Sequence, residues 1–203
     1  MKLYYSPGAC SLAAHIVADE ANLPLQLEKV DLKSHKTENG QDYYRINPKG
    51  YVPAIQLDDG SMLTENMAVL NYLADHTAQS LYTPAPGSMD HYRLEEWLGF
   101  ISSELHKSFG PLFQGGGETE KRKAKEKILK RLAYADEQLK GRPFLMGDRM
   151  TVADAYLFVM LTWAKKMKLD ITRYKNLAAF YAGMSRRDAV KRAFREEGLP
   201  LAA

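Results

Sequence analysis

Short apolar runs separated by turn signals fill the first 80 positions and predict a small sheet. Four strands are expected, at residues 2–5, 25–30, 52–57 and 61–63. Asp58-Asp59-Gly60 is a hairpin turn between the last two strands. Apolar residues at helical spacing add one helix from Ser11 and a second over 65–75. The predicted order is β-α-β, a connecting segment and β-β-α, with a parallel pair and an added antiparallel strand.

Long apolar stripes at intervals of three and four residues indicate that the remainder of the chain is helical. They cover residues 94–109, 124–139 and 153–164. The last stripe is apolar almost all round, so this helix is expected at the centre of a bundle. Thr151 and Asp154 resemble a capping box at its start, with Met150 placed for a hydrophobic staple. We therefore expect an all-helical second domain.

The predicted secondary structure and the net charge both change at the boundary between the two parts. The segment 81–88 carries spaced prolines and a glycine, as linkers do. Residues 1–80 have a net charge of −4 and the remainder has +7. We expect a first α/β domain at 1–80, a linker at 81–87 and the all-helical domain at 88–203.

The composition of the 203 residues is that of an ordinary soluble globular protein, with 45% hydrophobic and 26% charged residues. Global disorder is excluded because there is enough apolar material for a core. One cysteine excludes a disulfide-stapled secreted scaffold. A net charge of +3 is too small to indicate nucleic acid by itself. With no signal peptide or membrane span in the sequence, a cytoplasmic protein is expected.

Cys10 is the residue whose position points most clearly to chemistry. It follows a predicted strand and turn and lies at the start of a helix, where backbone N–H groups and the helix dipole stabilise an anion. A thiol in that position is expected to have its pKa lowered from about 8.5. With no second cysteine nearby, a redox cycle would need an external thiol. The alternative is a buried, inert cysteine.

Two other segments offer binding chemistry. In Tyr51-Val52-Pro53 a cis peptide bond before the proline would turn the Val52 backbone toward a ligand, and a plain edge strand is the alternative. Thr64-Glu65-Asn66 precedes a helix whose N-terminus can bind a carboxylate while Glu65 receives an ammonium group. This combination suits an amino-acid-like ligand, although helix capping alone explains the same residues.

Six stretches of the chain carry a family resemblance. They are Met1–Ser11, Asn47–Pro53, Leu63–Asn66, Glu96–Leu98, Ser103–Lys107 and Thr151–Phe158. In order and spacing they resemble the cytosolic glutathione transferases, and the bacterial beta class most closely. The resemblance implies a thioredoxin-like first domain, an all-helical second domain and a cis peptide bond before Pro53. It also implies a homodimer, with contact through the helix from Met89 to Phe113 and the helix after Glu65.

The resemblance also implies site residues. Cys10 would lie beside the glutathione sulfur, where it can form a mixed disulfide, and with His106 it is the expected catalytic pair. The implied glutathione-binding residues are Cys10, His35, Tyr51, Val52, Pro53, Glu65, Asn66, Ser103, Glu104, Leu105, His106 and Lys107. The electrophile is expected in a cleft between the domains, beside His106, Phe109 and Trp163.

Each part of the tripeptide has an implied partner. The Val52 backbone would pair with the cysteinyl part of glutathione. Glu65 and Asn66 would hold the γ-glutamyl end, and His35 would reach the glycyl carboxylate.

We expect an enzyme that attacks small apolar electrophiles with the thiolate of its co-substrate glutathione, a detoxifying activity. Two alternatives stay open. In the first, Cys10 exchanges with glutathione mixed disulfides, as in a glutathione-dependent thiol–disulfide reductase. In the second, the fold binds apolar ligands without catalysis, because Tyr51, His35 and Gly99 depart from the commoner pattern of the family.

Two further patterns are interpreted as structural. The basic residues at 121–131 interleave with an apolar stripe and fit a solvated helix face, so no nucleic-acid partner is expected. His15 and His91 show no ligand-like spacing with other His, Cys or acidic residues, so no metal site is expected.

Overall fold

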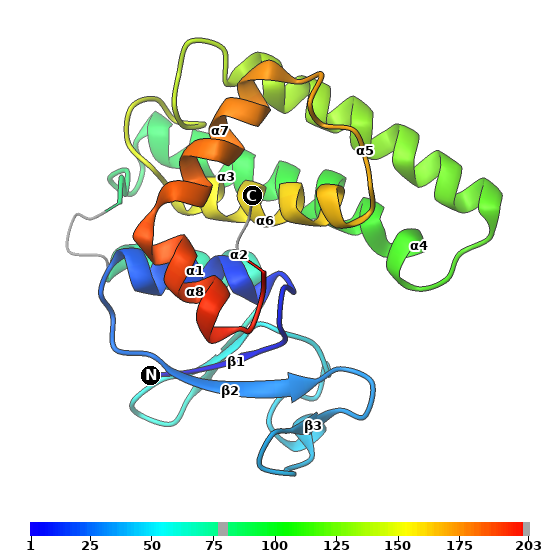
Figure 1. Cartoon of the computed structure of the whole chain (residues 1–203). Coiled ribbons are helices and arrows are strands. Elements are labelled where there is room, and N and C mark those ends of the chain that lie inside the picture. Colours follow the sequence, from blue (N-terminus) through cyan, green and yellow to red (C-terminus); the bar gives the residue numbers. More distant parts are fainter. Residues whose placement is uncertain (77–80, 201–203) are drawn as a thin grey trace. The chain divides into compact units, whose positions relative to one another are not determined.

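The computed structural model describes residues 1–76 and 81–200. Two compact units are present. The first joins the segment up to Leu81 with the C-terminal segment from Arg187, and the second runs from Tyr82 to Arg186. Figure 1 follows the chain through both units.

The first unit is built on a mixed sheet with five strands in its described residues, in the order β3-β2-β1-β4-β5. The strands are β1 (Lys2–Tyr5), β2 (Gln26–Asp31), β3 (Lys36–Thr37), β4 (Ala54–Gln56) and β5 (Met62–Thr64). β1 runs parallel to β2 and antiparallel to β4, and β4 pairs with β5 through the expected hairpin. This confirms the thioredoxin-like topology. The two-residue β3 lies in the segment predicted only as a connection. So short a run shows no alternating pattern, and the sequence therefore does not predict it as a strand.

The central strand β1 is buried on both faces. Helices α1 (Ser11–Glu20) and α2 (Asn66–Asp75) lie side by side on one face of the sheet (Figure 1). Leu3 and Ile55 are fully buried and paired in register, so both point to that face. On the other face Tyr4 packs with Tyr43, which the connecting segment supplies from a 3-10 turn. That segment is therefore part of the core.

The second unit is built from helices, as the apolar stripes predict. They are α3 (Met89–Phe100), α4 (Gly110–Phe113), α5 (Glu118–Gln138), α6 (Val152–Lys166) and α7 (Lys175–Arg186). α6 is buried along almost its whole length and is the central helix. The Asp154 carboxylate accepts hydrogen bonds from the N–H and the hydroxyl of Thr151, both at 2.8 Å, which confirms the capping box. Among the described residues, no helix is both long and apolar enough to cross a membrane.

The stripe over 94–109 is not one α-helix, and the helix expected from Met89 to Phe113 is interrupted. Between α3 and α4 the chain forms a π-helical turn at Ile101–Leu105 and a 3-10 turn at His106–Phe109. A wide turn followed by a tight one returns the apolar positions to nearly the same face, so their spacing does not reveal the interruption. Turns of this kind are frequent at functional sites, and His106 lies at the junction of the two.

The last helix, α8 (Asp188–Glu196), packs on α1 and so belongs to the first unit (Figure 1). The domain boundaries at 80 and 88 stay a prediction. The second domain is expected to run to residue 203, but α8 belongs to the first unit instead. The Arg187 guanidinium donates hydrogen bonds to both carboxylate oxygens of Glu20 in α1. Ionic contacts between such distant positions leave no periodic signal in the sequence, so the apolar stripes do not predict that α8 packs on α1.

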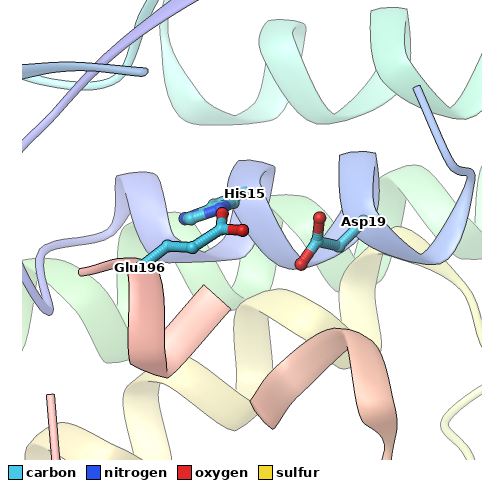
Figure 2. Close-up of side chains that lie close together, drawn as sticks. All are labelled: His15, Asp19 and Glu196. Atoms are coloured by element: carbon cyan, nitrogen blue, oxygen red, sulfur yellow. The ribbon is translucent and has the colours of Figure 1, made fainter. Parts of the chain in front are cut away.

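The side chain of His15 in α1 contacts the C-terminal end of α8 (Figure 2). Its buried ring places Nε2 2.9 Å from the Glu196 carboxylate and Nδ1 3.1 Å from the Glu197 carboxylate. Burial opposes a charge on the ring, but the hydrogen bonds with Glu197 and Glu196 outweigh it and raise the pKa of His15 above 6.5. Glu197 also accepts a hydrogen bond from the N–H of Gly8 at 2.8 Å. The same cluster therefore holds the loop that follows β1.

We predict that His15→Gln destabilises the protein most at low pH, by about 2 kcal/mol, the scale of a hydrogen bond to a charged group. Because the folded-state pKa of His15 is raised, the stabilisation is complete below the unfolded value of about 6.5 and is lost as pH rises through the folded value. Urea unfolding of wild type and variant at about pH 5.5, 7 and 9 measures the difference.

His76→Gln, at an exposed histidine of the first unit, is the matched control and should show no such trend. A His15→Gln effect that stays constant or grows with pH would mean that the buried ring is neutral.

Candidate active site

Cys10 is the N-cap residue of α1 and is buried, with 7% of its surface exposed. Its thiol donates a hydrogen bond to the backbone oxygen of Val52, with Sγ and O 3.2 Å apart. The helix N-terminus favours a thiolate, whereas donation to a carbonyl favours the neutral thiol. The lowered pKa expected for Cys10 therefore stays a prediction, and the structure adds an influence that opposes it.

The backbone around Val52 is held by buried neighbours. The Val52–Pro53 peptide bond is cis, as the resemblance implies. The preceding carbonyl, that of Tyr51, accepts hydrogen bonds from the Tyr43 hydroxyl at 3.1 Å and the Asn47 side-chain amide at 2.7 Å. Burial raises the pKa of Tyr43 to about 12, so its hydroxyl keeps the proton that it donates. This segment is consequently fixed before any ligand binds.

The turn that leads into this segment needs a glycine. The N–H of Gly50 donates to the Asn47 carbonyl at 2.8 Å, which confirms the expected turn. Gly50 has φ +72°, and an added Cβ would lie 2.5 Å from the Tyr44 ring. That ring also packs on His35, with centroids 4.5 Å apart. The Nδ1 atom of His35 is buried and has no hydrogen-bond partner among the described residues.

Glu65 is the centre of a polar cluster with Lys49 and Tyr51. One oxygen of its carboxylate accepts hydrogen bonds from the Lys49 ammonium and the Tyr51 hydroxyl, both at 2.5 Å. The hydrogen bond with Glu65 raises the pKa of Lys49 and also that of Tyr51. All three side chains are about half exposed, so a second cation can reach the carboxylate.

The start of α2 combines a strained backbone with an unpaired amide. Glu65 has φ +72° and ψ 122°, a conformation that L residues rarely adopt and that costs about 1–3 kcal/mol. The next residue, Asn66, is only 9% exposed, and neither Oδ1 nor Nδ2 has a hydrogen-bond partner among the described residues. A buried amide without partners loses its hydration with no compensation. Together these features indicate a binding site for a polar ligand.

The residues expected from the second unit form a separate group. Ser103 and Lys107 are exposed, whereas Leu105 is fully buried. The Glu104 carboxylate is 2.7 Å from the Arg131 guanidinium of α5, and this hydrogen-bonded pair holds the pKa of Glu104 below its usual range. The roles predicted for these four residues in glutathione binding stay predictions.

His106 is packed between two aromatic rings of α6. Its ring meets Trp163 edge-on at 4.9 Å and Tyr156 edge-on at 5.9 Å between centroids. Its Nδ1 lies 2.6 Å from the Tyr156 hydroxyl oxygen. Burial, assisted by the nearby charge of Lys107, lowers the pKa of His106 to about 4. The imidazole is therefore neutral at neutral pH.

The residues expected to bind the electrophile meet in one aromatic cluster. Trp163 makes edge contacts with Phe109 at 5.5 Å and with Phe113 at 4.9 Å between centroids. Phe109 is fully buried and Trp163 is 8% exposed, whereas Phe113 is 44% exposed. Phe113 therefore offers most of the surface of this cluster.

Three residues of these groups are missing from the sequence-based set. Lys49 is placed by the sequence only in a turn, and nothing in its spacing points to Glu65. Phe113 ends the expected long helix and belongs to no motif. Tyr156 lies within the stretch 151–158. Its hydroxyl, in a buried helix that is otherwise apolar, is the feature of the sequence that could have pointed to it.

One group of side chains could hold a metal ion. His15, Asp19 and Glu196 each place one ligand atom within 4.8 Å of the others (Figure 2). The interpretation that His15 has no acidic neighbour in ligand spacing is wrong, because Asp19 lies one turn along α1 and Glu196 comes from α8. Asp19 also pairs with Arg192 at 3.5 Å, a cation that opposes a bound metal. The expectation that the protein binds no metal stays a prediction.

Comparison with known families gives two matches along the chain. Residues 8–76 match the family described as glutathione S-transferase, N-terminal domain, and residues 94–188 match glutathione S-transferase, C-terminal domain. Over 200 residues the chain is 44% identical to glutathione S-transferase GstA of Escherichia coli O157:H7, with 98% of this chain and 100% of the relative covered.

Two solved structures are similar over the same length. A sphingomonad glutathione S-transferase complexed with glutathione has a TM-score of 0.94 and 45% identity. A Sphingomonas chungbukensis glutathione S-transferase, described as bacterial beta class, has a TM-score of 0.95 and 41% identity. In both cases 98% of this chain and 100% of the solved chain are covered. With both domains matched and a relative aligned along its full length, the chain belongs to the glutathione S-transferase family.

Proposed function

We propose that this protein is a glutathione transferase that joins the sulfur of glutathione to small apolar electrophiles. The observation that carries the proposal is the buried, unpaired amide of Asn66 beside the carboxylate of Glu65. The γ-glutamyl end of glutathione carries one ammonium and one carboxylate group. Glu65 would receive the ammonium, while the Asn66 amide and the N-terminus of α2 would bind the carboxylate. A sphingomonad relative solved in complex with glutathione supports the same ligand here.

The rest of the tripeptide is proposed to lie along the first unit. The backbone of Val52 would pair with the cysteinyl residue, in the segment that Tyr43 and Asn47 anchor. The buried Nδ1 of His35 would donate to the glycyl carboxylate, which would give that atom a partner. Pre-organised groups of this kind limit the entropy lost on binding.

The reaction needs the glutathione sulfur as a thiolate. The thiol loses its proton to solvent, the sulfur forms a bond to the electrophilic carbon, and the leaving group departs with the electron pair of the broken bond. We propose that Cys10 donates a hydrogen bond to the thiolate and so lowers its free energy, and that the neutral His106 is a second catalytic donor. Phe109, Phe113 and Trp163 would offer an aromatic surface to the electrophile.

We propose a homodimer that forms through α3 and α2. Met89 and Tyr92 of α3 are large apolar side chains with 67% and 58% of their surface exposed, which supports an interface on this helix. A cytoplasmic location and a role in detoxification, both typical of the family, belong to the same proposal.

A second candidate is the reduction of mixed disulfides by Cys10, the chain's one cysteine. Its thiolate would attack the glutathione sulfur of the disulfide, release the other thiol as a thiolate and become glutathionylated. A second glutathione would then attack that bond, regenerate Cys10 and leave as glutathione disulfide. The position of Cys10 against Val52, the residue proposed to bind the cysteinyl part, supports this candidate.

Calorimetric titration with reduced glutathione at neutral pH tests the proposal before any electrophile is chosen. We predict saturable binding of about one glutathione per subunit. Asn66→Ala and Glu65→Gln should each weaken it about 10- to 100-fold, because each removes a hydrogen bond to a charged group of the ligand.

Gln26→Ala removes an exposed amide at the start of β2 and is the matched control, so it should bind like wild type. The absence of binding at millimolar glutathione would contradict both thiol-based functions and leave apolar-ligand binding without catalysis as the better hypothesis. Equal affinities in all four proteins would place the γ-glutamyl end elsewhere.

The ammonium of Lys49 binds the carboxylate of Glu65, which is the proposed partner of the glutathione ammonium group. We predict that Lys49→Ala tightens glutathione binding by up to about fivefold, because the competing ion pair is exposed to solvent and therefore weak. Lys140→Ala, which removes another exposed lysine paired with a glutamate, should leave the affinity unchanged. A weaker affinity in Lys49→Ala would mean that Lys49 contacts the tripeptide directly.

Cys10→Ala separates the two thiol functions. We predict that the reduction of a glutathione mixed disulfide is lost, because no other cysteine can replace Cys10. Conjugation should persist at a reduced rate, since the catalytic donor proposed at His106 is still present. Both rates are measured on the same preparation. Unchanged reduction and conjugation together would leave Cys10 without a catalytic role.

A further inference from the structure

Two residues of one helix face hold the ring of His106. Tyr156 and Trp163 are seven positions apart in α6, which places them on the same face two turns apart. The imidazole lies between them, edge-on to both rings, with interplanar angles of 87° and 82°. Tyr156 is fully buried and Trp163 nearly so, and neither ring can turn away without disturbing the core of the second unit.

The contact between Tyr156 and His106 has a preferred direction. Oη and Nδ1 are 2.6 Å apart, a short hydrogen bond. A phenol O–H is a strong donor, and the unprotonated nitrogen of a neutral imidazole is a strong acceptor. Because the ring is neutral at neutral pH, one nitrogen carries the proton, and the hydrogen bond made by the other decides which one. Donation from Tyr156 to Nδ1 leaves the proton on Nε2.

We propose that Tyr156 is a positioning residue for catalysis: its hydroxyl donates to Nδ1 of His106 and so keeps the proton on Nε2, as the donor that the partly exposed imidazole offers to a substrate. This inference rests on the proposed function. A hydrogen bond accepted at one nitrogen also makes the N–H at the other a better donor. Tyr156 therefore acts on a substrate only through His106.

The backbone at His106 fits this role. The π-helical turn at Ile101–Leu105 and the 3-10 turn that begins at His106 interrupt the helix where the imidazole meets α6. A regular α-helix would direct that side chain differently, so the irregular turns and the two rings of α6 define its orientation together. His106 remains partly exposed, as a donor to a substrate must be.

The hydrogen bond can be tested without turnover. In the 15N spectrum of the free protein at neutral pH, we expect His106 to have an unprotonated Nδ1 and a protonated Nε2. In Tyr156→Phe the Nδ1 resonance should move downfield as its donor disappears. Tyr174→Phe is the matched control, since it removes another buried phenol hydrogen bond of the second unit, and it should leave the resonance in place. A protonated Nδ1 in the wild type would overturn the proposal.

Kinetics with a glutathione-reactive aryl halide test the catalytic consequence. Tyr156→Phe should lower kcat about 2- to 10-fold, the range of one neutral hydrogen bond, with the KM for glutathione unchanged. In a His106→Asn background the same substitution should have no further effect, because Tyr156 then has nothing to position. Tyr174→Phe should have equal effects in both backgrounds.

The outcomes separate this inference from the proposed function. If Tyr156→Phe lowers kcat equally with and without His106, the hydroxyl is merely structural and the inference is overturned. If His106→Asn retains full activity, the transferase function stands and the inference fails. If calorimetry finds no glutathione binding, the proposed function fails and takes the catalytic role of Tyr156 with it, whatever the 15N spectra show of the hydrogen bond.

Discussion

Two buried donors, the hydroxyl of Tyr43 and the side-chain amide of Asn47, converge on the backbone oxygen of Tyr51. Two residues of the first unit's site, Glu65 and Cys10, are connected to the segment that carries that oxygen. The Tyr51 side chain reaches Glu65, and the next carbonyl along the chain accepts the thiol of Cys10. The ring of Tyr43 at the same time covers one face of β1. The core and the site therefore share a residue, and the geometry of the site is as rigid as the packing beneath it.

The protein treats its buried polar groups in two different ways. At the start of α6, the carboxylate of Asp154 accepts hydrogen bonds from Thr151 and from the N–H of Leu145, which compensate part of the cost of its burial. At the start of α2, the Asn66 amide is almost as deeply buried and has no partner among the described residues. The first arrangement stabilises the fold, whereas the second lowers the stability of the free protein. A ligand that forms hydrogen bonds with the Asn66 amide would recover that free energy on binding.

The sequence predicts those features that depend on local pattern. The strands other than β3 follow from periodicity, as do α1, α2 and the buried helix α6. The cis bond before Pro53 follows from the family resemblance. Contacts that depend on three dimensions are different. Lys49 reaches Glu65, and α8 returns to α1, through side chains that no spacing rule connects. The irregular turns before α4 also escape, because an apolar stripe is compatible with several helical geometries. Sequence motifs thus identify site residues, whereas the neighbours that change the charge or orientation of those residues are identified only in the three-dimensional structure.

The return of α8 has a consequence for how the protein is made. Its residues, 188–196, are synthesised long after β1 and α1, yet they complete the unit that contains both. On the ribosome, the middle of the chain can therefore reach its final packing while the N-terminal sheet still lacks the helix that Glu20 and His15 hold. The loop before Cys10 gains its hydrogen bond to Glu197 only after that distant residue has been synthesised. The order of synthesis thus delays completion of the first unit until α8 has been made.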